Sequence, residues 1–166
     1  KVTKKFSTSM GEVDVSISNY KQNLAFVKRL SSEYGQDMVA LIDNFAKFTA
    51  SSRGTNLSLE QQKYIFEALT RAAAAYHLSA DRTTDMLNAV NQMMSKGKVA
   101  AEELRRQLGN TLPGAFNIMA AAVGVSTSRL DDMMKNGEII AEDVLPRFAE
   151  MLNKITEGKA TLSDLD

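Results

Sequence analysis

The chain has 166 residues, and its 20 acidic and 20 basic side chains leave no formal net charge at pH 7. This balance argues against a dedicated binder of DNA or anionic membranes, because such proteins usually carry a basic excess or a basic face. Cysteine is absent, which excludes disulfides and thiolate metal sites, and no apolar run approaches the roughly 20 residues that a membrane-spanning helix requires.

Residues 1–19 are expected to form a flexible or extended lead. Val13, Val15 and Ile17 alternate with polar residues as in a β-strand, but no second alternating run exists to pair with them. Helical spacing begins near Tyr20 and ends at Gly35.

Two further helices are predicted downstream. Apolar residues at helical spacing over 38–48 predict the first of them, and turn-forming residues over 51–56 predict a loop. Ser58 is a candidate N-cap for a long helix that runs to Tyr76.

One segment of the sequence occurs twice, as residues 93–104 and again as residues 133–144, with both Met, the Gly and the Ala-Glu pair identical. In these repeated segments, Gly97 and Gly137 follow apolar-periodic runs, where glycine readily adopts the left-handed backbone that ends a helix. The glutamate of each Ala-Glu pair falls in the first turn of the next helix, near its positive dipole end. Each repeated segment therefore predicts a helix, a tight turn and a helix.

The similarity extends upstream, where residues 74–82 align with residues 121–129. The changed offset implies that the middle helix of the second copy is seven residues shorter. Seven residues are close to two helical turns, so the same face stays inward. Ser79 and Ser126 are the expected N-caps.

Two prolines mark the second half of the chain. Pro113, between Leu112 and Gly114, is expected in the first turn of a helix that ends at Gly124. Pro146 is expected early in the last helix, either at a first-turn position or at a kink.

These patterns predict an all-α fold: a compact bundle of about eight helices with an internal helix-turn-helix duplication and essentially no sheet. The helical domain is expected over residues 20–157. Residues 158–166 are expected to be a C-terminal tail or the start of a next helix.

Side chains with catalytic or metal-binding chemistry are scarce. His77, the only histidine, aligns with Gly124, which favours a structural place at a helix end. The acidic pairs Glu102-Glu103 and Glu142-Asp143 could suggest the two carboxylates of a glycosidase, but their repetition at helix starts favours dipole compensation. We therefore expect no catalytic residue, no cofactor and no metal site.

Methionines and basic residues give two weaker signals. Both Met pairs, at 93–94 and 133–134, are expected in the core rather than on an adaptable binding surface. Arg105 and Arg106 form a basic cluster with Lys96 and Lys98, but intervening acidic residues favour a solvated helix face.

Several motifs follow one another in a specific order: Glu-Glu-Leu-Arg-x-Gln-Leu-Gly, then Leu-Pro-Gly-Ala, then Gly-Glu and Val-Leu-Pro. This order resembles the tape measure domain of phage and prophage tail tape measure proteins, and the likeness covers about residues 30–155. Arg129 stands where an acidic residue is expected, and His77 where glycine is common. The residues that carry the likeness are Gly97, Glu102, Glu103, Leu104, Gln107, Leu112, Pro113, Gly114, Gly124, Gly137, Val144, Leu145 and Pro146.

The resemblance implies a structural role. Tape measure proteins are long, largely helical chains that occupy the tail lumen, set the tail length while tube subunits polymerise, and are ejected with the DNA. Because the sequence opens with Lys1, we expect it to be a globular part of such a chain.

The implied partners are tail tube, tail-tip and tail-assembly chaperone proteins, with no small-molecule substrate, no specific nucleic acid and no membrane segment. The implied location is the virion tail, and the bacterial host cytoplasm during assembly. Two alternatives stay open: a peptidoglycan-degrading module of a tail protein, and a stand-alone helical adaptor.

Overall fold

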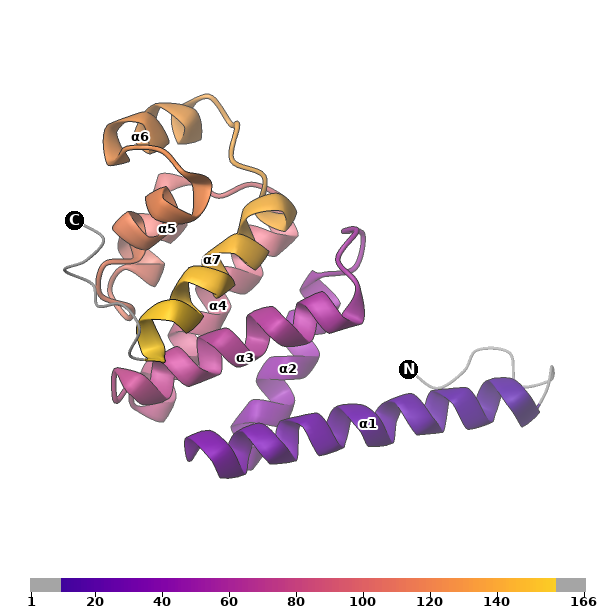
Figure 1. Cartoon of the computed structure of the whole chain (residues 1–166). Helices are drawn as coiled ribbons and strands as arrows, with labels where there is room; N and C mark the ends of the chain where they lie inside the picture. Colours follow the sequence, from indigo (N-terminus) through magenta and orange to yellow (C-terminus); the bar gives the residue numbers. More distant parts are fainter. Residues whose placement is uncertain (1–9, 158–166) are drawn as a thin grey trace.

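The computed structural model describes the backbone of residues 10–157 and the side chains of residues 21–157. Within residues 10–157 the chain forms eight helices and no strand, which confirms the predicted all-α bundle (Figure 1). None of these helices is long and apolar enough to cross a membrane. The helices are α1 (Met10–Tyr34), α2 (Met38–Ser51), α3 (Leu59–Ala75), α4 (Ala80–Lys96), the π-helix η1 (Glu102–Leu108), α5 (Ala115–Val123), α6 (Thr127–Lys135) and α7 (Ala141–Thr156).

Helix α1 begins at Met10 rather than near Tyr20, so the predicted extended lead is wrong from residue 10 onward. The alternating residues Val13, Val15 and Ile17 lie inside this helix. The N-terminal half of α1 projects from the rest of the molecule (Figure 1). The remainder of the lead and the predicted tail of residues 158–166 lie outside the described residues.

Four phenylalanines hold the first three helices together. Phe45 of α2 and Phe66 of α3 meet edge to face with ring centroids 5.0 Å apart. Phe26 of α1 lies 5.2 Å from Phe45, and Phe48 lies 5.8 Å from Phe66. Each such pair contributes about 0.5–1.5 kcal/mol beyond the burial of its apolar area.

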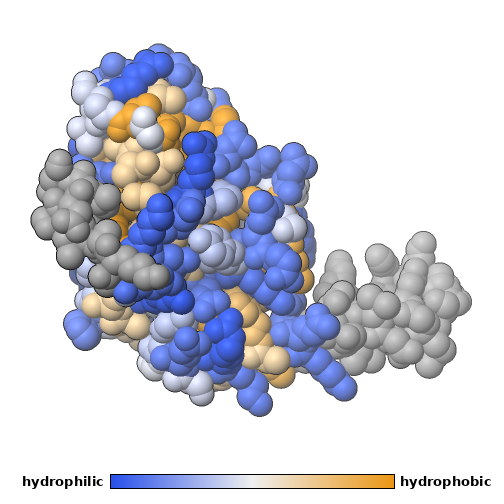
Figure 2. Space-filling model, in the orientation of Figure 1, coloured by the Kyte–Doolittle hydropathy of each residue, from blue (hydrophilic) through white to orange (hydrophobic). Residues whose placement is uncertain are grey.

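The other five helices continue the same core. Helix α7 packs against α3, α4 and α5, while α4 packs against α2 and η1, and α6 packs against α5. Met93, Met94 and Met134 are buried, and Met133 packs against the core, which confirms the core prediction for both Met pairs. Figure 2 shows the surface of the molecule in the same view. Hydrophobic residues lie over α5 and in the lower part of this view, and wide hydrophilic areas surround them.

The predicted N-caps are confirmed. The Ser58 hydroxyl accepts from the N–H of Gln61, whose side chain accepts in turn from the N–H of Ser58, so this cap is a capping box. Ser79 caps α4 and Ser126 caps α6 without a capping box, and the hydroxyl of each accepts one N–H of the first turn.

The two helix-ending glycines also behave as predicted, with φ of +82° at Gly97 and +71° at Gly137. The helices that precede them have 17 and 9 residues, so the second is the shorter one. The origin of the two units by duplication stays a prediction.

The structure corrects the prediction for Pro113 and narrows the one for Pro146. Helix α5 begins at Ala115 with Gly114 as its N-cap, so Pro113 precedes the helix instead of occupying its first turn. Pro146 lies in the second turn of α7, which excludes the first-turn alternative. Having no N–H, it leaves the carbonyl of Glu142 without the usual helical donor.

Candidate functional site

The two repeated segments lie side by side in the structure. The N–H of Val99 donates to the carbonyl of Ile139 (2.9 Å), and the N–H of Ala141 donates to the carbonyl of Gly97 (3.0 Å). Val99 and Ile139 are buried. The sequence shows that the two segments are alike, but only the tertiary structure shows that they pair with each other.

The end of the Lys98 side chain lies over the turn at Gly137, where an added Cβ would be 3.1 Å from its Nζ. This flexible side chain can move aside, so the positive φ of +71° is what favours glycine at position 137. The paired segments thus form a junction that sets where η1 and α7 begin.

Glu103 departs from the simple role of a dipole-compensating surface residue. It is only 1% exposed, and Nζ of Lys96 donates to its Oε2, while its Oε1 has no hydrogen-bond partner among the described residues. Its neighbour Glu102 is exposed and pairs with Arg106 on the same helix. The two carboxylates therefore have different environments and do not face each other across a cleft.

The segment that carries the Glu-Glu-Leu-Arg motif is a π-helix, which the sequence did not indicate. The N–H of Gly109 donates to the carbonyl of Leu104, five residues earlier, at 3.0 Å. Leu104 is fully buried and Gln107 is half-buried. In a π-helix each hydrogen bond spans five residues instead of four, and such segments are frequent at functional sites.

The predicted basic cluster proves to be a face of paired charges. Arg105 lies over the ring of Phe116, with 3.8 Å from its guanidinium carbon to the ring centroid, and it also pairs with Asp131. Arg106 pairs with Glu102 and Lys96 with Glu103. The exposed Arg105 and Arg106 support the prediction of a solvated helix face, whereas Lys96 pairs with the buried carboxylate of Glu103.

Most of the other motif residues serve the core and the helix ends. Leu112, Val144 and Leu145 are buried, whereas Pro113 is exposed and Pro146 half-buried. Gly114 and Gly124 have φ of +76° and +87°. His77 follows the end of α3 with φ of +56°, the conformation that Gly124 takes at the aligned position. Most of these motif residues thus lie in the core or at helix ends, and their structural role stays a prediction.

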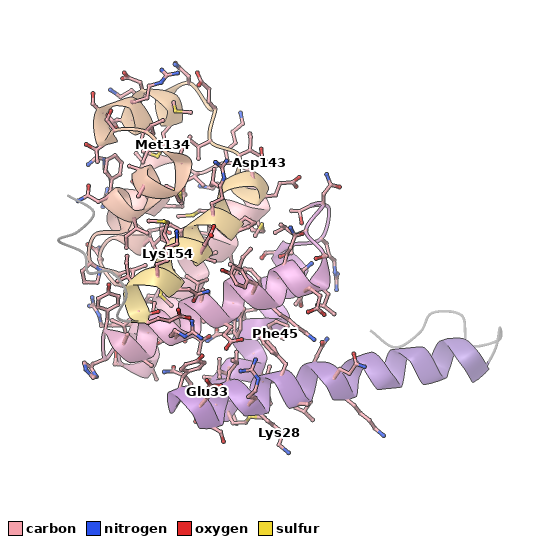
Figure 3. The ribbon with its side chains drawn as sticks, viewed as in Figure 1. Lys28, Glu33, Phe45, Met134, Asp143 and Lys154 are labelled. Carbon is pink, nitrogen blue, oxygen red and sulfur yellow. The ribbon has the colours of Figure 1, made fainter. Side chains whose placement is uncertain are left out.

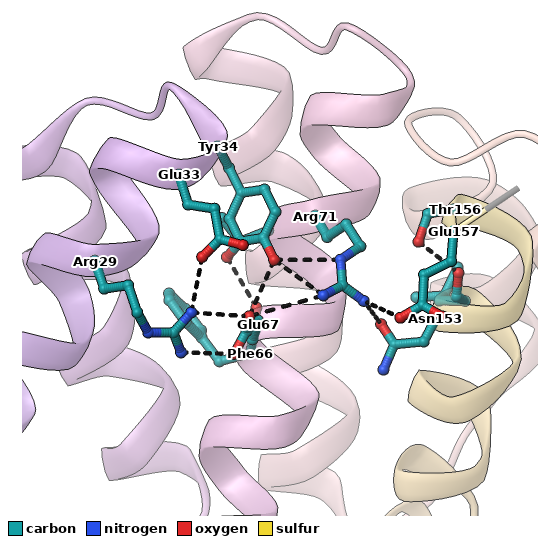
Figure 4. Close-up of polar contacts among 11 residues, drawn as sticks. Arg29, Glu33, Tyr34, Phe66, Glu67, Arg71, Asn153, Thr156 and Glu157 are labelled. Carbon is teal, nitrogen blue, oxygen red and sulfur yellow. Dashed lines mark hydrogen bonds and ion pairs between the residues drawn. The ribbon is translucent and has the colours of Figure 1, made fainter.

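A polar cluster that the sequence did not predict joins α1, α3 and the C-terminal end of α7 (Figure 4). Glu67 accepts from both Nη atoms of Arg29 and from the Tyr34 hydroxyl. Arg71 donates to that hydroxyl and to Asn153. Its members are Arg29, Glu33, Tyr34, Glu67, Arg71, Asn153 and Glu157. Residues so distant in sequence give no local signal of this cluster.

The cluster changes the acidity of its members. Hydrogen bonds from Arg29 lower the pKa of the Glu67 carboxyl. Burial raises the pKa of the Tyr34 hydroxyl. The charged groups of the cluster form ion pairs with one another, and these pairs connect α1, α3 and α7. Such pairing indicates a structural role for the cluster.

Several hollows open on the described surface. One, of about 590 Å³, lies between α2 and α4, and the amide side chains of Asn88, Asn91 and Gln92 are among its walls. Another, of about 180 Å³, lies between α1 and α2, with Leu24, Ile42 and Phe45 among its walls. A third, of about 270 Å³, lies beside Arg105 and Phe116. Among the described residues, no group of three or more His, Cys, Asp or Glu is placed to hold a metal ion.

Comparison with known proteins shows which family this sequence is similar to. A family model described as "Tape measure protein" matches residues 2–164. The "Probable tape measure protein" of Salmonella phage Felix O1 (isolate Felix O1-VT1) is 28% identical over 154 residues, which are 93% of this chain and 21% of that protein. The chain therefore spans about a fifth of the length of this relative. No solved structure matches this chain significantly.

Proposed function

Because this chain belongs to the tape measure protein family, we propose that it is a globular structural domain through which a longer tail protein takes part in phage tail assembly. The family match over residues 2–164, which includes every described helix, carries the proposal. The described motif residues support it, because they build helix ends, a turn junction and core rather than a cleft lined by reactive groups.

The size of this domain bears on which part of the parent protein could set the tail length. A single α-helix lengthens by about 1.5 Å per residue, whereas a globular domain of about 150 residues has a radius of gyration of only about 15 Å. We propose that extended helix elsewhere in the parent protein sets the tail length and leaves with the DNA. This domain instead docks to tail tube, tail-tip or chaperone proteins, in the host cytoplasm during assembly and then in the virion tail.

In-frame deletions in the phage gene test this division of labour. Removing 100 residues of extended helix is expected to shorten the tail by about 150 Å in electron micrographs. Removing the coding region of this domain is expected to lower the number of complete tails without a matching shortening. Tails that shorten by about 1.5 Å per residue when this domain is removed would contradict the proposal, as would an unchanged length after the helix deletion.

Docking is tested by co-expression of the tagged domain with the tail tube, tail-tip and chaperone proteins of the same phage. We expect one of them to co-purify at a defined ratio. If all three fail to associate with the folded domain, the docking role is wrong, whereas the family assignment is unaffected.

A peptidoglycan-degrading activity is tested separately. We expect the purified domain to release no cell-wall fragments, because Glu103 is buried against Lys96 and Glu102 is paired on the surface. Release that disappears in Glu102→Gln and Glu103→Gln variants would overturn the structural assignment. A short isolated gene, instead of a long gene beside tail genes, would favour a stand-alone adaptor.

A further inference from the structure

The hollow between α2 and α4 is large enough for a ligand. Its volume is about 590 Å³, within the range of about 300–1,000 Å³ that is common for ligand sites. Its walls come from Lys47, Ala50 and Ser51 of α2 and from residues 88–96 of α4. At about 1.5 Å per residue, the α4 wall is about 12 Å long. An extended chain rises about 3.3 Å per residue, so about four of its residues fit along this wall.

The wall of the hollow is not part of the packed face of α2. Phe45 points toward α1 and α3, where its ring meets those of Phe26 and Phe66 (Figure 3). Lys47 and Ala50 lie on another side of α2, because residues two and five positions from Phe45 do not share its helix face. The core contacts of α2 therefore leave this side of the helix to a ligand.

The wall that α4 contributes is a stripe of neutral hydrogen-bonding side chains. It consists of Asn88, Asn91, Gln92 and Ser95, which share one helix face, and all but Asn91 are exposed. A solvated helix face usually includes charged residues, as residues 81–85 of α4 do with three of them. The centre of a protein–protein interface is depleted of charge. The neutral stripe therefore favours an interface over an ordinary solvated face.

The amides of this stripe have unused hydrogen-bonding capacity. Among the described residues, neither Asn88 nor Gln92 has a side-chain hydrogen-bond partner. Asn91 accepts from the Ser51 hydroxyl at 3.4 Å, which leaves its NH₂ group available. A side-chain amide carries a C=O acceptor and N–H donors, the same groups as a peptide bond. Asn88 and Gln92 can therefore each accept from and donate to the backbone of an extended chain.

The charged side chains at the hollow are basic. Lys47 and Lys96 line it, and none of its described lining residues is acidic. Lys96 pairs with Glu103, which is only 1% exposed, so the lysine presents the accessible charge of this pair. Lys47 pairs with Asp43, one turn earlier on α2 and outside the hollow. Acidic side chains of a ligand would thus meet two lysines, whereas basic side chains would meet no carboxylate of the wall.

The same lining argues against other classes of ligand. None of the described lining residues is aromatic, and single-stranded nucleic acids usually stack their bases on aromatic rings. The chain also has no net charge, whereas nucleic-acid-binding domains are usually basic. No histidine or carboxylate of the described lining is available to hold a metal ion. An extended polypeptide is the class that the hollow fits best.

We propose that the hollow between α2 and α4 binds an extended, acidic segment of a partner protein. The backbone of this segment bonds to the amides of Asn88 and Gln92, and its carboxylates face Lys47 and Lys96. Backbone hydrogen bonds supply affinity for an extended chain, while the two lysines select for acidic side chains. The inference rests on the docking role proposed above and deepens it, because it names the surface and the chemistry of the partner.

Peptide binding to the 166-residue chain tests the chemistry of the ligand. The probes are overlapping synthetic peptides that cover the tail tube, tail-tip and chaperone proteins of the same phage, with fluorescence anisotropy as the readout. We expect binding by a peptide rich in Asp and Glu, and a Kd about tenfold higher when these are replaced by Asn and Gln. No binding by any peptide overturns the proposal, as does equal binding of the neutral version. Binding of a single-stranded oligonucleotide in place of the peptides would also overturn it.

Substitutions in the wall test the location. Gln92→Glu adds a carboxylate of nearly the same shape and should raise the Kd of the acidic peptide about tenfold, whereas Gln92→Lys should not raise it. Asn88→Ala should raise it about fivefold, as expected for the loss of one hydrogen bond. Gln22→Glu is the matched control, because Gln22 is exposed on α1 and does not line the hollow.

Circular dichroism confirms that each of these variants is folded. A Kd unchanged in Gln92→Glu or in Asn88→Ala would show that the hollow is not the site, as would a control weakened as much as Gln92→Glu.

Co-purification with the whole tail proteins separates this inference from the docking role. If one of them associates equally with the wild type and with Gln92→Glu, the docking role stands and the proposed site is wrong. If none associates with the wild type, the docking role is wrong and the inference falls with it.

Discussion

Replacing Gly109 by alanine is expected to destabilise the protein more than replacing Gly97, although only Gly97 has a positive φ. The backbone at Gly109 has φ of −63°, which any residue can adopt. A Cβ there would lie 2.2 Å from the carbonyl oxygen of Arg105, whereas real Cβ contacts essentially never fall below 3.0 Å. The last turn of η1 must therefore shift by at least about 0.8 Å.

The two costs can be compared. Forced overpacking of this kind costs about 1–3 kcal/mol, and at Gly109 the clashing atom is backbone, which has little freedom to move aside. At Gly97 nothing lies within 4 Å of the added Cβ. Alanine there bears about 1–2 kcal/mol for the left-handed conformation, offset by about 0.4–1 kcal/mol from the reduced entropy of the unfolded chain. The same entropy offset applies at Gly109, so the net cost is about 0–1.6 kcal/mol at Gly97 and about 0–2.6 kcal/mol at Gly109. We expect Gly109 near the upper end of its range, because backbone atoms cannot move aside easily.

Thermal unfolding followed by circular dichroism measures the difference. In a chain of this size, 1 kcal/mol shifts Tm by about 2–4 °C. We expect Gly97→Ala to lose a few degrees at most and Gly109→Ala to lose about twice that or more. Gly124→Ala, which has φ of +87° and open space, serves as a second control and should match Gly97→Ala. A Gly109→Ala protein as stable as either control would refute the steric argument and the π-helical geometry on which it rests.

Three further changes have defined outcomes. Phe66→Ala removes the fully buried ring that contacts three other phenylalanines and should cost about 3–5 kcal/mol in urea denaturation; a loss below 1 kcal/mol would contradict the aromatic core. Ser58→Ala should cost about 1 kcal/mol, because it opens the capping box with Gln61; an unchanged urea midpoint would contradict this role. Arg29 lowers the pKa of Glu67, so this carboxylate contributes stability above its ordinary pKa of 4.5 and loses it as the pH falls through the lower folded value. The difference in Tm between wild type and Glu67→Gln should therefore shrink on acidification from pH 6 to pH 3, and a constant difference would contradict the linkage.

Local sequence signals predicted the helix ends well. Ser58, Ser79 and Ser126 cap helices as expected, because a cap is a contact between residues three positions apart. Gly97 and Gly137 adopt the predicted backbone for the same reason, since a left-handed residue is a local requirement.

The predictions were less accurate where two local patterns competed. Over residues 10–19, alternation favoured a strand, while the spacing of three and four on the same residues favoured a helix, and the helix formed. The π-helix was missed because an Ala-Glu-Glu-Leu segment satisfies the pattern of an ordinary α-helix. In the π-helix Leu104 and Leu108 are buried together with Glu103.

The sequence by itself determined the all-α class, the positions of most helix ends and the placement of both Met pairs in or against the core, because each depends on residues within a few positions of one another. Only the tertiary structure decided that the two repeated segments pair through Val99 and Ile139, and that Arg29, Glu67, Arg71 and Asn153 join three helices. Such contacts form between residues separated by tens of positions, whose meeting depends on how whole helices pack and leaves no periodic trace in the chain.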